Sequence, residues 1–121
     1  MKKVFQSICI IYLFTIHFCM AQFKVPDSVA VQMKNKPDSV AIDLLNEYAK
    51  NVYLKEFDKA KFIADSTYKW AKKVNYVRGY AKSQEISGLV YYYNGDYNKS
   101  AQLFVSSLKL YEQLGDINGQ A

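Results

Sequence analysis

The chain has 121 residues, half of them hydrophobic, and a formal net charge of +5. Both cysteines, Cys9 and Cys19, and the one histidine, His17, lie within residues 1–21. Without that segment the chain has no thiol nucleophile, disulfide, imidazole base, or cysteine or histidine metal ligand. Composition therefore excludes most familiar catalytic constellations from the rest of the chain, and we expect no cofactor, no metal site and no enzyme activity.

The first 21 residues have the organisation of a secretory signal peptide. Two lysines precede an apolar run over residues 8–18, and the small residues Cys19 and Ala21 occupy the −3 and −1 positions of a cleavage site. We therefore expect residues 1–21 to be removed and the mature protein to be exported across the inner membrane. Its predicted location is the periplasm or another extracytoplasmic face.

Two alternatives to a cleaved signal are a membrane anchor and a lipoprotein. A spanning helix needs roughly 20 apolar residues, and this run is shorter and is interrupted by Thr15 and His17. A lipoprotein would be acylated at Cys19, but such a site needs a small residue before the cysteine, and Phe18 is there. The cleaved signal is our interpretation, with the lipoprotein as the minor alternative.

The charge left after cleavage is mildly basic. Removing the two lysines of the signal leaves 14 basic against 11 acidic residues, a net charge of +3. A solvated helix end explains the densest basic group, because cations suit the C-terminal end of a helix dipole; an acidic partner or a membrane surface is the functional alternative. An exported chain does not usually meet nucleic acid, so we expect no nucleic-acid partner. The basic group consists of Lys69, Lys72, Lys73, Arg78 and Lys82.

Residues 22–37 form a polar lead-in with two similar segments. Pro26–Ala30 and Pro37–Ala41 contain the same five residues, eleven positions apart. Each is typical of a helix start, with proline fixing the approach and aspartate or serine offering a side-chain oxygen to unpaired N–H groups. Only the second precedes a long periodic stretch. The first therefore predicts an irregular or one-turn element.

Four helices follow, each predicted by apolar residues at i, i+3 and i+4 spacing. Gly95 and Asp96 supply a turn and an N-cap before the last helix. Gly115 supplies the left-handed residue that ends it, and Asp116 is the expected N-cap of a fifth helix. No parallel-strand pattern or glycine-rich phosphate loop accompanies them, so the predicted fold class is all-α. The expected helices cover about residues 40–53, 57–73, 77–94 and 97–114.

The chain repeats its residue character with a period of 40. Tyr53–Ala60 aligns with Tyr93–Ser100, and Asn75–Ala81 aligns with Gly115–Ala121. Periods of roughly 20 to 50 residues are typical of stacked supersecondary units, which usually offer a surface rather than a catalytic centre. We therefore expect two units and the beginning of a third that is cut off.

Small residues and aromatics recur in the second unit where two helices are expected to cross closely. They are Gly88, Tyr91, Gly95, Tyr97, Ser100 and Ser107. This set resembles the motif of tetratricopeptide repeats (TPR), with serine in place of the preferred alanine at the last two positions. The chain departs from the motif at Gln84 and Ser87, where tryptophan and leucine are usual, and at Glu112, where proline is usual.

The first unit matches the same motif at Phe57 and Ala60. The expected small position falls on Tyr48, and a turn one residue longer around 54–56 would bring Ala49 into register. The resemblance implies antiparallel helix pairs stacked as a solenoid of about two repeats plus the start of a third. The expected units are the signal peptide 1–21, the lead-in 22–37, repeat one at 38–75, repeat two at 76–115 and a truncated third repeat at 116–121.

The resemblance also implies a function in protein–protein interaction or sensing. The first helix of each pair lines the concave face of such arrays, which implies a groove for a protein or peptide ligand. The alternative for each of these residues is that it is an ordinary surface side chain that contacts no ligand. Similar proteins of the Bacteroidetes are exported signalling proteins of the sensor histidine kinase type, which implies further repeats or a membrane-linked output domain beyond Ala121. The candidate groove residues are Lys82, Glu85, Leu89, Tyr92 and Tyr93.

The sequence favours two other functional classes less. Asp58 and Asp65 lie on one predicted helix face and could form an acid/base pair, but lysines flank them, which is typical of a solvated face. A glycan-binding helical protein of the outer-membrane nutrient-uptake type is the non-enzymatic alternative. Such proteins usually begin as lipoproteins and stack sugars on exposed tryptophan, whereas Trp70 is the only tryptophan here and is expected to pack against the following unit.

Overall fold

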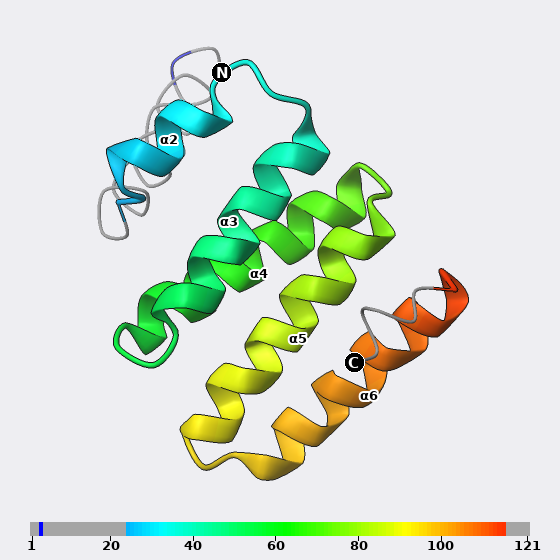
Figure 1. The fold of residues 1–121 in the computed structure, drawn as a ribbon. Coiled ribbons are helices and arrows are strands. Elements are labelled where there is room, and N and C mark those ends of the chain that lie inside the picture. The colour runs from blue at the N-terminus through cyan, green and yellow to red at the C-terminus, as the bar shows by residue number, and fades with distance from the viewer. Residues whose placement is uncertain (1–2, 4–23, 116–121) are drawn as a thin grey trace.

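The computed structural model describes residues 3 and 24–115, and residues 24–115 form five helices and no strand (Figure 1). The all-helical prediction is therefore confirmed over this range. Apart from Lys3, the predicted signal peptide at 1–21 lies outside the described residues, as does the start of a third repeat at 116–121. The helices are α2 (Asp27–Met33), α3 (Asp38–Val52), α4 (Phe57–Lys73), α5 (Val77–Tyr93) and α6 (Tyr97–Gln113).

The limits of the four long helices agree with their predicted limits to within two residues. In the turn between α5 and α6, residues close together in the sequence are sufficient to set where one helix ends and the next begins. Gly95 has a φ of 87°, and the Asp96 carboxylate accepts a hydrogen bond from the Lys99 backbone N–H at 3.1 Å. Gly115 has a φ of 66° at the end of α6. Both glycines therefore take the left-handed conformation that other residues rarely adopt.

The N-terminal lead-in is more ordered than its sequence predicts. α2 is a helix of seven residues, where an irregular or one-turn element is expected. Val29 and Met33 are half-buried, and α2 packs against α3, so a tertiary contact stabilises a second turn that an isolated short helix would not keep. The expected side-chain caps are also wrong. Pro26 and Pro37 occupy the N-cap positions of α2 and α3, and neither helix has a side-chain cap hydrogen bond.

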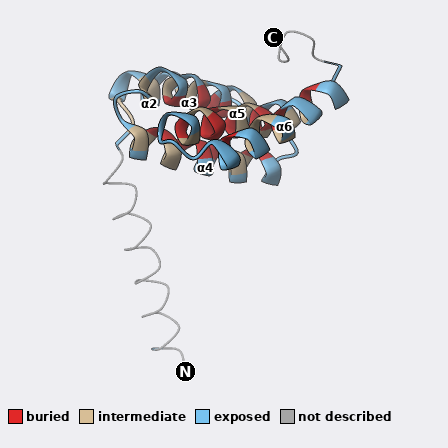
Figure 2. Cartoon of the chain, turned by 90° about the horizontal axis from the view of Figure 1, so that it is seen from below, coloured by how far each residue is buried: buried red, intermediate tan, exposed pale blue. Residues whose placement is uncertain are grey.

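Consecutive helices pack against one another, and α3 also contacts α5. Figure 2 shows the buried residues between the helices, along the middle of the stack. Six of the eleven buried apolar residues are alanine, so the helices approach one another closely over much of the core. The eleven are Ala41, Ile42, Ala49, Ala60, Ile63, Ala64, Ala71, Ala81, Ile86, Val90 and Tyr111.

A buried polar network crosses the first three long helices. Asn46 Nδ2 donates to the Gly79 carbonyl at 3.0 Å, and Thr67 Oγ1 donates to Asn46 Oδ1 at 2.7 Å. Asn46 and Thr67 are 1% and 0% exposed. Because buried polar groups are costly unless they are hydrogen-bonded, this network fixes the positions of α3, α4 and the start of α5. Apolar periodicity places Asn46 and Thr67 on the buried faces of their helices, but it does not indicate that they bond to each other or to Gly79.

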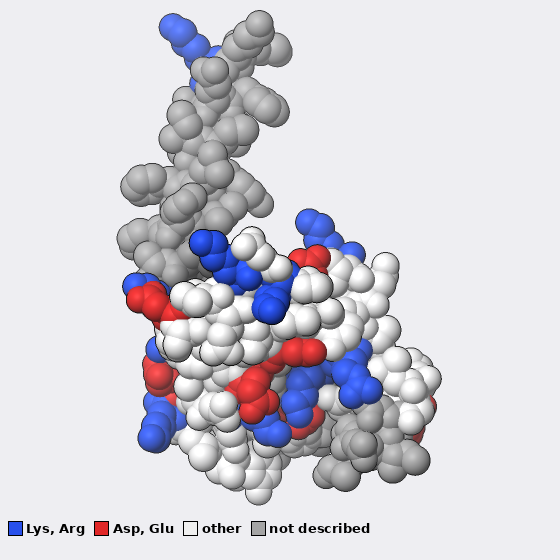
Figure 3. All heavy atoms as spheres, turned by 45° about the horizontal axis from the view of Figure 1, so that its top comes forward, with Lys and Arg blue, Asp and Glu red and all other residues white. Residues whose placement is uncertain are grey.

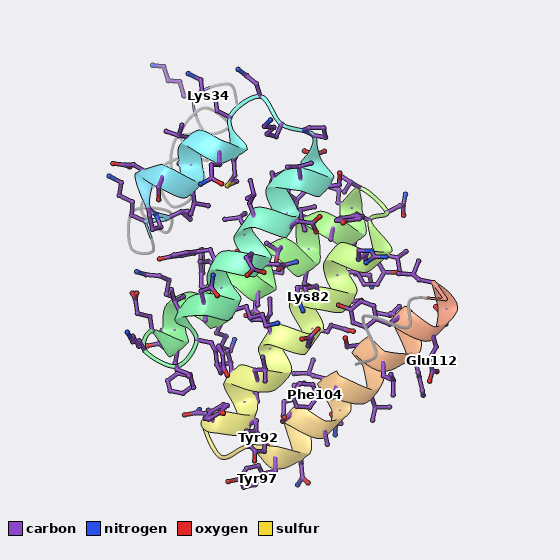
Figure 4. All side chains as sticks on the ribbon, in the orientation of Figure 1. Lys34, Lys82, Tyr92, Tyr97, Phe104 and Glu112 are labelled. Carbon is purple, nitrogen blue, oxygen red and sulfur yellow. The ribbon has the colours of Figure 1, made fainter. Side chains whose placement is uncertain are left out.

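The close contact of α5 with α6 depends on Gly88. A Cβ at Gly88 would lie 2.8 Å from a carbon of the Phe104 ring, which lies between the two helices (Figure 4). Ser100 Oγ donates to the Gly88 carbonyl at 2.8 Å, and Ser107 Oγ donates to the Ala81 carbonyl at 2.8 Å. The two serines therefore join α6 to α5 by hydrogen bonds as well as being small, a role that alanine could not fill.

Candidate functional site

The five residues of the expected groove follow one another along α5. They extend over roughly 16 Å, at about 1.5 Å of rise per residue. Half-buried Leu89 separates a charged part from an aromatic part. The charged part consists of Lys82 and Glu85, and the aromatic part consists of Tyr92 and Tyr93.

The charged part is engaged within the chain. Lys82 Nζ donates to the two Glu85 carboxylate oxygens at 3.1 and 3.0 Å. The hydroxyl of Tyr111, which is buried on α6, donates to Glu85 Oε2 at 3.3 Å. These bonds connect α5 with α6, and the Lys82 and Glu85 side chains are only 29% and 25% exposed. The charged part therefore stabilises the helix pair and presents little free charge to a ligand.

Four tyrosines form a continuous aromatic surface where α3 and α5 end and α6 begins. We call Tyr53, Tyr92, Tyr93 and Tyr97 the tyrosine cluster. Ring centroids lie 5.5 Å apart for Tyr53–Tyr93, 5.3 Å for Tyr92–Tyr93 and 5.4 Å for Tyr92–Tyr97. The last three tyrosines of the cluster are 51%, 53% and 63% exposed. Figure 4 shows Tyr92 and Tyr97 side by side at this end of the molecule.

The rings of the cluster hold one another in place. Each of the three pairs meets edge to face, a geometry that contributes about 0.5–1.5 kcal/mol per pair beyond the burial of area. Burial and a hydrogen bond with Tyr93 raise the pKa of Tyr53. Leu54, the next residue in the chain, is 56% exposed. The cluster is thus a preformed surface with apolar ring faces and hydroxyl groups.

The motif residues are divided between the interior and the surface. Ala60, Gly88, Ser100 and Ser107 are buried, Phe57 and Tyr91 are half-buried, and Gly95 and Tyr97 are exposed. The repeat motif predicts Tyr97 as a packing aromatic and does not include Tyr53, although both belong to the tyrosine cluster. The period of 40 carries the missing signal, because it aligns Tyr53 with Tyr93.

Apart from the tyrosine cluster, a recess of about 310 Å³ is lined by residues of α4, α5 and α6. Tyr91 lines it, and Lys61 Nζ lies 6.0 Å from the Tyr91 ring centroid. Gln84 also lines it, but Gln84 Oε1 is buried and has no hydrogen-bond partner among the described residues. A buried oxygen cannot meet a ligand in the recess, and leaving it unpaired costs about 1–3 kcal/mol. We therefore infer no ligand contact for Gln84 in this recess.

The described residues contain no group of three or more acidic, histidine or cysteine side chains that could hold a metal ion. Asp58 and Asp65 are exposed, and Asp65 accepts a hydrogen bond from Lys61 Nζ at 2.8 Å.

On the face drawn in Figure 3, basic and acidic side chains are interspersed. Lys72 Nζ, from the basic group, lies 5.3 Å from the Tyr68 ring centroid. In the part of the chain that is described, no helix has the length and apolar character needed to cross a membrane.

Comparisons with known proteins give no match for this chain. No protein-family model matches it, and neither a curated protein nor a solved structure does so. The function of the chain is therefore inferred from the geometry of its own residues.

Proposed function

We propose that the chain is an exported, TPR-like module that binds a protein or peptide partner through the tyrosine cluster. Two regularities support the repeat architecture. α4 and α6 begin 40 residues apart and end 40 residues apart. α3 contacts α5 as well as α4, as expected when the first helices of neighbouring pairs stack. Close crossing at Gly88, the small-residue position of the motif, is also compatible with such a stack.

The exposed tyrosine cluster is the observation that carries the binding proposal. An aromatic side chain can bury about 150–250 Å² in an interface, and tyrosine is enriched in such interfaces. Tyr92, Tyr93 and Tyr97 are each more than half exposed, so most of this area is available to a partner. Their contacts with one another reduce the conformational entropy that binding would cost.

The chemistry of the cluster suits a peptide segment. Ring faces can contact apolar side chains, and the hydroxyl groups can hydrogen-bond to backbone groups or polar side chains. Leu89 continues the surface along α5 toward the Lys82–Glu85 pair, which suits an extended or helical segment. The glycan-binding alternative depends on an exposed tryptophan, and Trp70 is half-buried beside α2 residues and lies outside the cluster.

Export and membership of a larger signalling protein belong to the same proposal. The basic start, short apolar run and small residues before Gln22 support export. The family resemblance supports further repeats or an output domain linked through a membrane. Intact mass of the protein from the cell envelope tests export, and we expect a chain that begins at Gln22. Acylation of Cys19 would contradict this and favour the uptake-lipoprotein alternative.

Selection from a peptide-display library against the purified protein tests the binding function. We expect the selected peptides to bind the Tyr92→Ser/Tyr97→Ser double variant at least about tenfold more weakly, which corresponds to about 1.4 kcal/mol. The matched control is Val105→Ser/Leu108→Ser, which removes two exposed apolar side chains of α6 outside the cluster. Equal losses in both variants would contradict binding at the cluster. Failure to select any peptide, together with a glycan-array ligand that requires Tyr92, would favour the glycan alternative.

A further inference from the structure

A pocket beside α2 forms a second candidate site, which we call the α2 pocket. Its volume is about 530 Å³, and residues from α2, α3 and α4 line it. This volume lies within the range of small-molecule sites, about 300–1,000 Å³. It shares no residue with the tyrosine cluster. The apolar lining includes Val25, Met33, Leu45, Phe62 and Trp70.

The described residues 24–115 leave the α2 pocket incompletely filled. α2 packs against α3 but not against α4, so the α4 side chains that face α2, Phe62 and Trp70, are left only half-buried. The core directly beside Phe62 is closed, since Ile63 and Ile86 are 3% and 0% exposed. Protein interiors are normally close-packed. An apolar ligand would therefore complete the burial of side chains that α2 leaves partly open.

The polar groups of the lining indicate the chemistry of that ligand. Ser66 Oγ already donates to the Phe62 carbonyl at 2.8 Å, so its hydroxyl hydrogen is used within α4. Among the described residues of the lining, Lys24 alone is charged. Its contact with Asp27 is 3.3 Å long between side chains that are 77% and 84% exposed, and such surface pairs are weak. We propose that the α2 pocket binds a long-chain carboxylate, with its hydrocarbon chain against Trp70 and its carboxylate at Lys24.

Trp70 reports directly on this pocket because it is the only tryptophan in the chain. Dodecanoate, added below its micelle concentration, should shift Trp70 emission to shorter wavelength in a saturable titration. Dodecyltrimethylammonium has the same chain with the opposite charge, and we expect it to bind at least about tenfold more weakly. Acetate, which has the head group without the chain, should leave the emission unchanged.

Two variants place the binding in the α2 pocket. Ser66→Leu fills the pocket from α4 at an exposed position, so we expect it to fold normally and to bind dodecanoate at least about tenfold more weakly. Ser106→Leu is the matched control, because Ser106 is the counterpart of Ser66 forty residues later and lies outside the pocket. Lys24→Gln should reduce the preference for dodecanoate over the cationic amphiphile. Circular dichroism of each variant verifies that it is folded.

Several results would overturn the proposal. The first is an unchanged Trp70 emission together with no heat of binding in calorimetry. Another is equal affinity for the anionic and cationic amphiphiles, which would exclude recognition by Lys24. A third is that Ser66→Leu binds as well as the parent protein, or that Ser106→Leu loses as much affinity as Ser66→Leu. Either of these would show adsorption at a site other than the α2 pocket.

Discussion

Replacing Asn46 by aspartate removes a buried hydrogen-bond donor and introduces a group that can ionise. Asn46 is 1% exposed, and its Nδ2 donates to the Gly79 carbonyl at 3.0 Å while its Oδ1 accepts from Thr67 Oγ1 at 2.7 Å. In Asn46→Asp, an ionised carboxylate would set a second oxygen against the Gly79 carbonyl oxygen. Only the protonated acid can donate to that carbonyl. The folded state therefore favours the protonated form and raises the pKa of the new carboxyl above its unfolded value.

The size of the effect follows from proton linkage. An aspartate in the unfolded chain has a pKa of about 3.9, and below that pH both states are protonated, so the variant keeps most of the parent stability. At higher pH the unfolded state ionises first. Stability then falls by about 1.4 kcal/mol per pH unit until the raised pKa of the folded state is reached. The largest loss at pH 7 is thus about 4 kcal/mol, a large share of the about 5–15 kcal/mol typical of a domain.

Urea denaturation followed by circular dichroism measures this loss. The parent, Asn46→Asp and Asn46→Ala are compared at about pH 4, close to the unfolded pKa, and at about pH 7, well above it. Asn46→Ala loses the same two hydrogen bonds but cannot ionise, so its difference from the parent should not change with pH. If Asn46→Asp stays within about 0.5 kcal/mol of the parent at pH 7, as a surface substitution would, the buried contact with Gly79 is refuted.

Three further predictions concern other contacts. Gly88→Leu should lower the free energy of unfolding by about 1–3 kcal/mol, because a Cβ there would lie 2.8 Å from the Phe104 ring; an unchanged urea midpoint would contradict this contact. Gln84→Met should raise the free energy of unfolding by about 1 kcal/mol, because it removes a buried acceptor that has no partner among the described residues; a lower midpoint would count against it. The Tyr76 hydroxyl donates to both Asp43 carboxylate oxygens at 2.9 and 2.8 Å, and burial together with this hydrogen bonding raises the pKa of Tyr76 to about 12. The associated stability is complete below about pH 10 and is lost as the pH rises toward 12, so pH-dependent melting of Tyr76→Phe should lack this alkaline loss.

The positions of the long helices follow from the sequence by itself. Apolar periodicity marks the faces of α4, α5 and α6, and these features depend only on neighbours along the chain. Gly95 and Gly115 take the left-handed conformation that ends α5 and α6, as their places in the sequence predict. The small residue Gly88 likewise indicates a close helix crossing, and the Phe104 ring lies against it.

The interior polar network and the order of α2 are properties of the tertiary structure. Asn46 follows Ile42 by four positions and precedes Ala49 by three, so helical spacing places it on the buried face of α3, but nothing in the local pattern indicates its hydrogen-bond partners. Its position becomes favourable only when Thr67 and Gly79 are brought to it from two other helices. In the same way, the helical conformation of Val29 is stabilised only when α2 packs against α3.

Part of the candidate binding surface could be predicted from the sequence, and part is decided only by the tertiary structure. Tyr92 and Tyr93 could be named in advance, because helical spacing and the repeat resemblance place them on one part of α5. Tyr53 and Tyr97 join them only because α3 and α5 end beside one another and α6 begins at the same place. Periodicity assigns a residue to a face of its own helix. A ring contact between tyrosines forty positions apart depends instead on how the helices pack, so only the tertiary structure could decide it.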